Sequence, residues 1–360
     1  MHFWDRIDKP IIGLSPMDGV TDASFRLVAA RYGRPDLCMT EFTSVEAICC
    51  GADGFVRDFA YGEYERPILA QIYGRTPEDF YRVAHIVCEL GFDGLDINMG
   101  CPAKNVANKG CGAGLILNPE LAVTIIRAAR RGIEDWAAGQ RLEAVGLETD
   151  VLERVRRMNR ERVQPLTREE IPLSVKTRIG YDKVEVDQWI PVLLGERPVA
   201  LSVHGRTLKQ MYKGSADWDA IGRVVELARG TGILVLGNGD LKSMSDVVAR
   251  VRQTGVHGVL LGRGAMGNPW VFRDKQWAKD TLAGLMAPCG AELDVTREER
   301  TQVLLEHSRH FESLWGERRF PAMRKHLAWY CKGFRGAAQW RARLVRAMNA
   351  DEVARIVGAN

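Results

Sequence analysis

The sequence predicts an α/β fold, a (β/α)₈ TIM barrel followed by an all-helical domain. Eight short apolar runs alternate with longer amphipathic stretches over the first three quarters of the chain. Such runs are typical of strands buried on both faces, and a repeated strand–helix unit favours a closed parallel barrel. No G-x-G-x-x-G motif follows the first run, so a Rossmann dinucleotide site is not indicated. The eight predicted strands are Ile11–Leu14, Leu37–Thr40, Ile68–Ile72, Gly94–Asn98, Leu173–Thr177, Ala200–Val203, Ile233–Leu236 and Gly258–Leu261.

Helical periodicity fills most of the gaps between these strands, as at Pro77–Leu90, Pro119–Arg131 and Ser243–Thr254. Two of these helices begin with proline, whose missing N–H costs nothing at the first helical position. The connection Gly132–Glu170, between the fourth and fifth strands, is unusually long, and we interpret it as an insertion. It contains a predicted helix, Thr149–Arg162, which ends in the basic string RVRRMNRER.

The C-terminal part of the chain follows a different pattern. After Arg273 the strand rhythm stops, and Arg297–Val357 is predicted to form several helices without a strand between them. Glycine, proline and cysteine interrupt the helical pattern at Gly284–Asp294, where we expect a domain boundary. The predicted organisation is a barrel domain of residues 1–290, with an insertion at 132–170, and a helical domain of residues 291–360.

The composition is that of a soluble globular protein, with 46% hydrophobic and 27% charged residues among 360. No apolar run reaches the roughly 18 residues that a membrane span needs, and the N-terminus lacks a signal-peptide pattern. We therefore expect a cytoplasmic protein without membrane association. The eight cysteines show no C-x₂-C spacing, so no metal site is predicted.

The positive charge is concentrated near the C-terminus. Residues 297–360 contain 13 Lys+Arg and 7 Asp+Glu, a net charge of +6. The first 296 residues therefore hold 37 basic and 39 acidic residues, a net charge of −2. An excess of this kind is common on nucleic-acid-binding surfaces, although a solvated helix surface would account for it equally well.

Candidate functional residues follow from the rule that barrel chemistry lies at the C-terminal ends of the strands. Glycine turns after the seventh and eighth strands, Gly237–Asp240 and Gly262–Arg263, are typical of phosphate sites, because backbone N–H groups and a helix dipole bind a dianion. The alternative is that these glycines serve only tight turns. The rim residues singled out are Pro16, Met17, Gln71, Asn98, Cys101, Lys176, Arg178, His204, Arg206, Asn238, Gly239, Asp240, Gly262 and Arg263.

Three of these residues have chemically distinct alternatives. Lys176 is consistent with a Schiff base, a phosphate ligand, a fixed positive charge or a structural ion pair. A lone histidine is more often a core residue, but His204 directly precedes Gly-Arg at a strand end, which favours a functional role. Cys101 lies in a Gly-Cys-Pro turn that holds its thiol at the rim, as an acid or nucleophile would require, whereas Cys111 among small residues indicates packing.

Six segments occur in a fixed order: SPMDGVTD, DINMGCPAK, SVKTRIG, VHGRT, GNGD and GRGAMGNPWVF. Together they resemble the signature segments of the tRNA-dihydrouridine synthases. Further along, RKHLAWYCKGF and WRARL resemble the helical RNA-binding domain of the same family. The resemblance extends from about Pro10 to Ile356, and DINMGCPAK in register with the other segments is its most specific part.

The resemblance implies an enzyme that reduces the 5,6 double bond of uridines in tRNA. It implies a bound FMN, reduced by NADPH, that passes a hydride to C6 of the uracil. Cys101 would protonate C5 from the opposite face, and Asn98 and Arg178 would hold the uracil carbonyls. The partner would be tRNA, and we expect a monomer. The implied flavin contacts are Pro16, Met17, Gln71, Lys176, His204, Asn238, Gly239, Asp240, Gly262 and Arg263.

This reading is chemically reasonable, because a thiol with an ordinary pKa of about 8.5 stays protonated at neutral pH and can act as an acid. The chain departs from the family pattern in the length of the 132–170 segment, whose basic helix we expect to extend the RNA surface, and in the thiol at Cys111. One alternative is a flavoenzyme of the dihydroorotate dehydrogenase kind, which acts on a free pyrimidine. Another is an RNA-binding barrel without catalysis.

Overall fold

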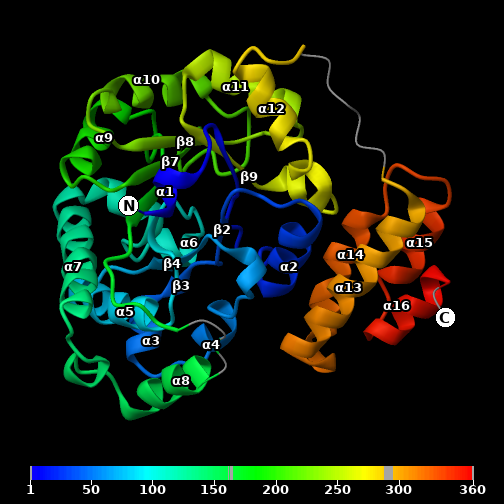
Figure 1. Cartoon of the computed structure of the whole chain (residues 1–360), viewed down its shortest axis with the longest axis horizontal. Helices are drawn as coiled ribbons and strands as arrows, with labels where there is room; N and C mark the ends of the chain where they lie inside the picture. The colour runs from blue at the N-terminus through cyan, green and yellow to red at the C-terminus, as the bar shows by residue number, and fades with distance from the viewer. Residues whose placement is uncertain (1, 161, 163–164, 288–294, 359–360) are drawn as a thin grey trace.

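The structure, a computed structural model, describes residues 2–160, 162, 165–287 and 295–358. Eight parallel strands form a barrel, which confirms the predicted fold class (Figure 1). A two-residue strand that was not predicted, β3 (Thr43–Ser44), pairs with the third barrel strand. The eight strands are β1 (Ile11–Leu14), β2 (Cys38–Met39), β4 (Ile68–Tyr73), β5 (Gly94–Met99), β6 (Leu173–Arg178), β7 (Ala200–His204), β8 (Leu234–Asn238) and β9 (Gly258–Leu261).

The barrel closes between its first two strands. The pairing order is β1-β9-β8-β7-β6-β5-β4-β2, so β1 and β2 are the two ends of the sheet. Two backbone hydrogen bonds join these ends: Asp36 N–H donates to the Ile12 carbonyl at 2.8 Å, and Leu14 N–H donates to the Leu37 carbonyl at 3.0 Å. The C-terminal ends of all eight strands therefore surround one opening.

Helices cover the outside of the barrel (Figure 1). Their starts follow from local sequence: Pro119 occupies a first helical position behind the Asn118 cap, and Ser243 forms a capping box with Asp246. The helices of this part of the chain are α1 (Phe3–Arg6), α2 (Ala23–Tyr32), α3 (Val45–Cys49), α4 (Phe55–Asp58), α5 (Pro77–Glu89), α6 (Lys104–Ala107), α7 (Pro119–Ala137), α8 (Thr149–Arg160), α9 (Val186–Gly195), α10 (Trp218–Ala228), α11 (Met244–Thr254) and α12 (Lys275–Leu282). Short 3₁₀ turns lie at Glu63–Glu65, Gly112–Leu117, Leu142–Ala144, Arg263–Ala265, Pro269–Phe272 and Glu317–Met323.

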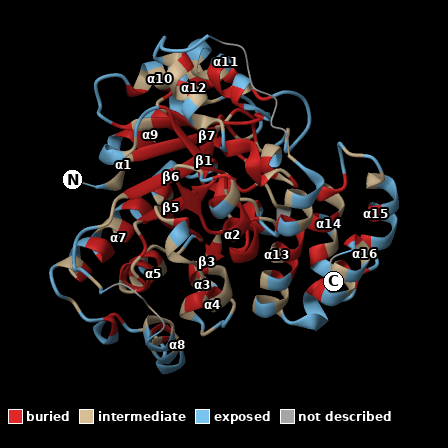
Figure 2. Cartoon of the chain, turned by 45° about the vertical axis from the view of Figure 1, so that its right-hand side comes forward, coloured by how far each residue is buried: buried red, intermediate tan, exposed pale blue. Residues whose placement is uncertain are grey.

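The barrel interior is apolar at the N-terminal ends of the strands. There Trp4 of α1 is fully buried in a cluster with Ile11, Leu69, Leu236 and Leu260. Figure 2 shows buried residues concentrated on the strands and on the helix faces that cover them. Trp4 therefore closes the N-terminal end of the barrel, and polar inward-facing side chains such as Asn98 and Lys176 lie at the opposite, C-terminal end.

The C-terminal helices pack beside α2 (Figure 1). Leu27 and Val28 of α2, with Trp270, share one buried cluster with residues of these helices such as Leu304 and Val353. The predicted domain boundary at 284–294 lies mostly outside the described residues, so the division at residue 290 stays a prediction. No helix in the described ranges is both long and apolar enough to cross a bilayer. The C-terminal helices are α13 (Arg297–Trp315), α14 (Arg324–Tyr330), α15 (Ala337–Leu344) and α16 (Ala350–Val357).

Candidate active site

Strand alternation brings the predicted polar residues to one opening. Side chains on a strand point alternately to its two faces, so Asn98 on β5 and Lys176 on β6 face inward while their strand neighbours pack against the helices. The strand register places Asn98 opposite Lys176, Arg178 opposite His204, and His204 opposite Asn238. Four adjacent strands therefore deliver these five predicted residues side by side.

The turn that carries Cys101 is held by two of the predicted residues. The Asn98 Oδ1 atom accepts hydrogen bonds from the backbone N–H groups of Gly100, at 3.0 Å, and Cys101, at 2.8 Å. Arg178 Nε donates to the Gly100 carbonyl at 2.6 Å. The predicted substrate ligands Asn98 and Arg178 thus position the thiol, a task that the sequence did not indicate.

The Cys101 thiol is suited to donate a proton. Its residue is only 8% exposed, and burial raises the thiol pKa, although the nearby charges of Arg178 and Lys176 act in the opposite direction. A thiol with a raised pKa is protonated at neutral pH. Cys111 is also buried and shares a small cluster with Cys101 and Val106, so the structure brings the two thiols into one neighbourhood.

Lys176 is a buried cation with unused hydrogen-bonding capacity. It is 9% exposed, and burial lowers its pKa to about 8, helped by the charge of Arg178. Among the described residues its ammonium group forms one hydrogen bond, to Asn238 Oδ1 at 3.4 Å, and no ion pair. Since a lysine ammonium has three donors, the site is arranged to accept an anionic or oxygen-rich group beside Lys176.

A buried carboxyl group that the sequence analysis missed supports this arrangement. Asp96 accepts from Gln71 Nε2 at 2.7 Å and from Ser174 Oγ at 2.5 Å, and burial raises its pKa to about 6. Gln71 Oε1 accepts in turn from Asn98 Nδ2 at 2.9 Å. A continuous set of hydrogen bonds therefore runs from Ser174 to the turn that holds Cys101. The available signal was the position of Asp96, two residues before Asn98 and hence on the same strand face.

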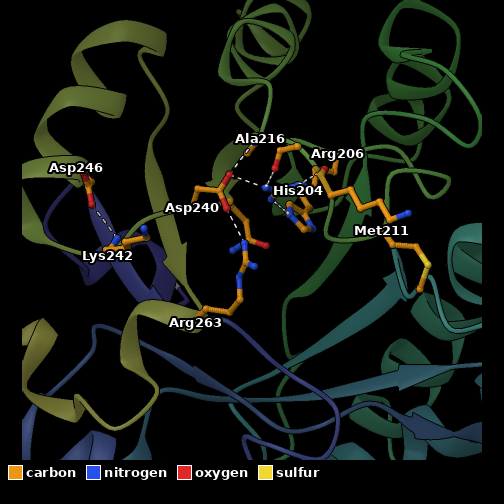
Figure 3. Close-up of polar contacts among 12 residues, drawn as sticks. His204, Arg206, Met211, Ala216, Asp240, Lys242, Asp246 and Arg263 are labelled. Carbon is orange, nitrogen blue, oxygen red and sulfur yellow. Dashed lines mark hydrogen bonds and ion pairs between the residues drawn. The ribbon is translucent and has the colours of Figure 1, made fainter. Parts of the chain in front are cut away.

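The glycine turn after β8 adopts a conformation that favours glycine. Gly239 has a φ of +136°, and a Cβ atom built there would lie 2.5 Å from the Ala216 Cβ. The next residue, Asp240, accepts from Arg206 and from Arg263 at 2.6 Å each, and from Ala216 N–H at 2.8 Å (Figure 3). The predicted phosphate partner Arg263 is therefore already paired with Asp240.

Arg206 organises this side of the opening, although it was not assigned a role from the sequence. It is 2% exposed, pairs with Asp240, and donates from Nη1 to His204 Nε2 at 3.3 Å (Figure 3). Because a guanidinium can only donate, Nε2 must accept, which places the ring proton of His204 on Nδ1. Burial, together with the charges of Arg178 and Lys176, holds the pKa of His204 well below its ordinary value. His204 is thus a neutral donor at neutral pH.

The remaining predicted residues meet where β1 and β9 pair. Pro16 and Met17 follow β1 and are half-buried, and Gly262 directly follows β9. A Cβ atom on Gly262 would lie 3.1 Å from Met17 Sδ, so the absence of a side chain permits this close approach. This edge of the opening is therefore lined by backbone and by a polarisable thioether.

A pocket of about 310 Å³ adjoins the Cys101 turn. Its wall includes Phe42 and Tyr73, whose rings pack edge to face with centroids 4.8 Å apart, and both rings pack against the cluster of Cys101. The volume lies within the range typical of small-molecule sites. Ala103, Asn105 and Val106, which follow Cys101 in the chain, line the pocket, whereas Cys101 itself does not.

Comparisons with known proteins agree with these features. The chain matches the family model described as dihydrouridine synthase over residues 13–136 and 149–358. It is 33% identical to the "Probable tRNA-dihydrouridine synthase 2" of Bacillus subtilis, covering 98% of this chain and 94% of that protein. It is 32% identical to the "Probable tRNA-dihydrouridine synthase" of Staphylococcus aureus strain COL, covering 98% and 93%.

Among solved structures, the chain is similar to the old yellow enzyme homologue from Zymomonas mobilis, with 14% identity and a TM-score of 0.42 over 74% of this chain and 87% of that chain. The family match leaves out residues 137–148, a shorter stretch than the predicted insertion, and it includes helix α8. It spans well over half of the chain, and the two sequence relatives are matched over almost their whole length. The chain therefore belongs to the dihydrouridine synthase family, as its sequence segments predicted.

Proposed function

We propose that this protein is a flavin-dependent tRNA-dihydrouridine synthase, which uses FMN and NADPH to reduce the 5,6 double bond of uridines in tRNA. The observation that carries the proposal is the pairing, at one opening, of a protonated buried thiol with a buried cation. Cys101 supplies the thiol, and Lys176 supplies a cation with free donors. Membership of the dihydrouridine synthase family supports the reaction, and the names of the relatives support tRNA as the substrate.

The residues at the opening fit a flavin. The Gly239 and Gly262 turns pack closely against Ala216 and Met17, and glycine turns at strand ends can offer backbone N–H groups to a phosphate. Lys176 offers a positive charge to the anionic part of the ring, and the Nδ1–H of His204 offers a neutral donor. When bound, a reduced flavin would supply the hydride that saturates C6 of a uracil.

The chain's own residues would act on the uracil. Cys101 delivers a proton to C5. Hydrogen bonds of its turn with Asn98 and Arg178 hold the thiol in place for this step. The second Nδ2 hydrogen of Asn98 and the Nη2 group of Arg178 have no partner among the described residues, so they can donate to the uracil carbonyls, where charge develops during reduction. A uridine in folded RNA must leave its stack to reach this opening, where the rings of Phe42 and Tyr73 pack against the cluster that contains Cys101.

Lys176 predicts a pH dependence for flavin binding. In the flavin-free protein its pKa is about 8, and an anion bound beside it would raise that pKa. Binding then takes up a proton, so the affinity for FMN should fall as pH rises through 8, by up to about tenfold in total between pH 7 and pH 9. Fluorescence titration of the apoprotein with FMN would measure this slope.

The Lys176→Met variant is the control for that measurement. Methionine keeps the length of the side chain but carries no charge, so the variant should bind FMN more weakly at pH 7 and with little change up to pH 9. The same pH slope in the wild type and the variant would rule out Lys176 as the titrating group.

The proposed reaction is tested by nucleoside mass spectrometry of an unmodified tRNA transcript incubated with the protein and NADPH. Dihydrouridine should form, and its amount should depend on the reductant. A yellow, flavin-loaded protein that reduces a free pyrimidine but leaves the transcript unchanged would refute the proposal. A protein that binds RNA but no flavin would refute it in favour of a binding role.

A further inference from the structure

Helix α8 presents a stripe of arginines away from the barrel. Its apolar side is buried, since Val151 and Val155 are 0% exposed within the main core cluster. Arg156, Arg157 and Arg160 are exposed on the other side of the helix. The helix is therefore anchored firmly enough to hold these charges in fixed places.

Only some of these arginines have internal partners. Arg154 donates to the Gly51 carbonyl at 2.9 Å, and Arg156 pairs with Glu143 at 2.8 Å. Arg157 and Arg160 form no hydrogen bond or ion pair with the residues that the structure describes. Asp150, Glu153 and the four arginines at 154, 156, 157 and 160 surround one open space on the surface of α8. Two guanidinium groups there are free to bind an anion.

The stripe continues toward the basic C-terminal helices. Arg154 ties α8 to the loop before α4, and on α4 the Arg57 guanidinium lies 5.1 Å from the ring centroid of Trp315, at the end of α13. Arg319 lies 5.4 Å from the same ring centroid. Figures 1 and 2 show α4 between α8 and the C-terminal helices, so the arginines of α8, Arg57 of α4 and Arg319 lie on neighbouring elements.

We infer that Arg157 and Arg160 of α8 form a second contact with the phosphate backbone of the substrate RNA. The inference rests on the proposed function, which makes RNA the substrate. A polyanion bound along the C-terminal helices and past α4 would reach these arginines, and guanidinium groups match phosphate oxygens in geometry. Arg157 and Arg160 lie three residues apart on an anchored helix, so their guanidinium groups can contact successive phosphates of an RNA backbone.

The helix dipole offers a simpler account of the same charges. An acidic residue near the start of α8 and arginines near its end each interact favourably with the helix dipole. That account predicts a change in stability and no change in RNA affinity when the arginines are replaced. The two explanations therefore separate in a binding experiment.

The test uses the full-length Arg157→Gln/Arg160→Gln variant and an unmodified tRNA transcript. Fluorescence anisotropy would give the binding constant at several salt concentrations. The variant should bind several-fold more weakly at low salt, and its slope of log K against log salt should be smaller by up to about 2. The control is Arg223→Gln/Arg229→Gln, which replaces an exposed arginine of α10 and the exposed arginine that directly follows this helix. Figure 1 shows α10 on the opposite side of the barrel from α8, so both quantities should stay unchanged.

Two further measurements sharpen the result. Arg157→Lys/Arg160→Lys should keep most of the salt slope, because charge and not shape determines counterion release. In the glutamine variant, KM for tRNA should rise while kcat at saturating tRNA stays close to wild type. Unchanged affinity in the glutamine variant, with a wild-type protein that binds tRNA and forms dihydrouridine, would overturn this inference alone. A wild type that does not bind tRNA would overturn it together with the proposed function.

Discussion

Replacing Cys101 with alanine is expected to lower the rate of uridine reduction by about 10²- to 10⁴-fold, the usual contribution of a general acid. The thiol is held at the barrel opening by hydrogen bonds from its turn to Asn98, and its raised pKa keeps the proton available at neutral pH. Alanine removes the proton and leaves the turn intact, since the backbone N–H of residue 101 makes the bond. Rapid mixing of reduced protein with tRNA, monitored by flavin reoxidation, would measure the loss.

Reduction of the flavin by NADPH should be unaffected in this variant, because that step needs no proton from Cys101. The matched control is Cys111→Ala, a change to the other buried thiol of the same cluster, which should keep nearly full activity. Loss of activity in Cys111→Ala together with retained activity in Cys101→Ala would show that Cys111, and not Cys101, is the general acid.

Arg26→Ala is expected to lower the free energy of unfolding by about 3–5 kcal/mol, the typical cost of breaking a buried ion pair by removing one partner. Arg26 on α2 and Glu65 are 0% and 1% exposed, and Arg26 Nε lies 2.6 Å from Glu65 Oε2. Arg26 also donates to the backbone carbonyls of Thr21 and Ala60. Alanine therefore leaves a buried carboxylate and two carbonyl groups without their partner. Urea unfolding followed by circular dichroism would measure the change.

The same helix supplies the comparison. Arg31 pairs with Glu306 of α13, but its side chain is 54% exposed, so Arg31→Ala should cost at most about 1 kcal/mol. Replacing both Arg26 and Glu65 with leucine should destabilise the protein less than the two single changes added together, because no unpaired charge then remains. Additive effects would show that the buried pair does not act as a unit.

The sequence predicted the strands well, because strands buried on both faces leave an uninterrupted apolar signature. The first and last barrel strands have the predicted bounds, and the others differ by one or two residues. Helix α7 extends past its predicted end at Arg131, because Gly132 does not end it. A Cβ at Gly132 would lie 2.5 Å from the Tyr81 carbonyl oxygen, so this glycine allows α7 to pack closely on α5. A glycine that stops a helix and one that permits close packing look alike in sequence.

The sequence predicted which residues form the candidate site, but not the hydrogen bonds and ion pairs between them. Strand ends pointed to Lys176, His204 and Asp240, and the structure brings them to one opening. The pairing of Asp240 with both Arg206 and Arg263 depends on how separate loops meet, which periodicity does not encode. The roles assigned to these residues in binding flavin and uracil remain predictions.

The core shared between α2 and the C-terminal helices has a consequence for how this protein could have evolved. Leu27, Val28 and Trp270 belong to the barrel part of the chain, yet they are buried by residues of the helical part such as Leu304. A barrel cut free of its helices would expose this surface to water and tend to aggregate. The C-terminal helices therefore cannot be exchanged independently of the barrel. A different RNA-recognition domain could replace them only if α2 changed at the same time.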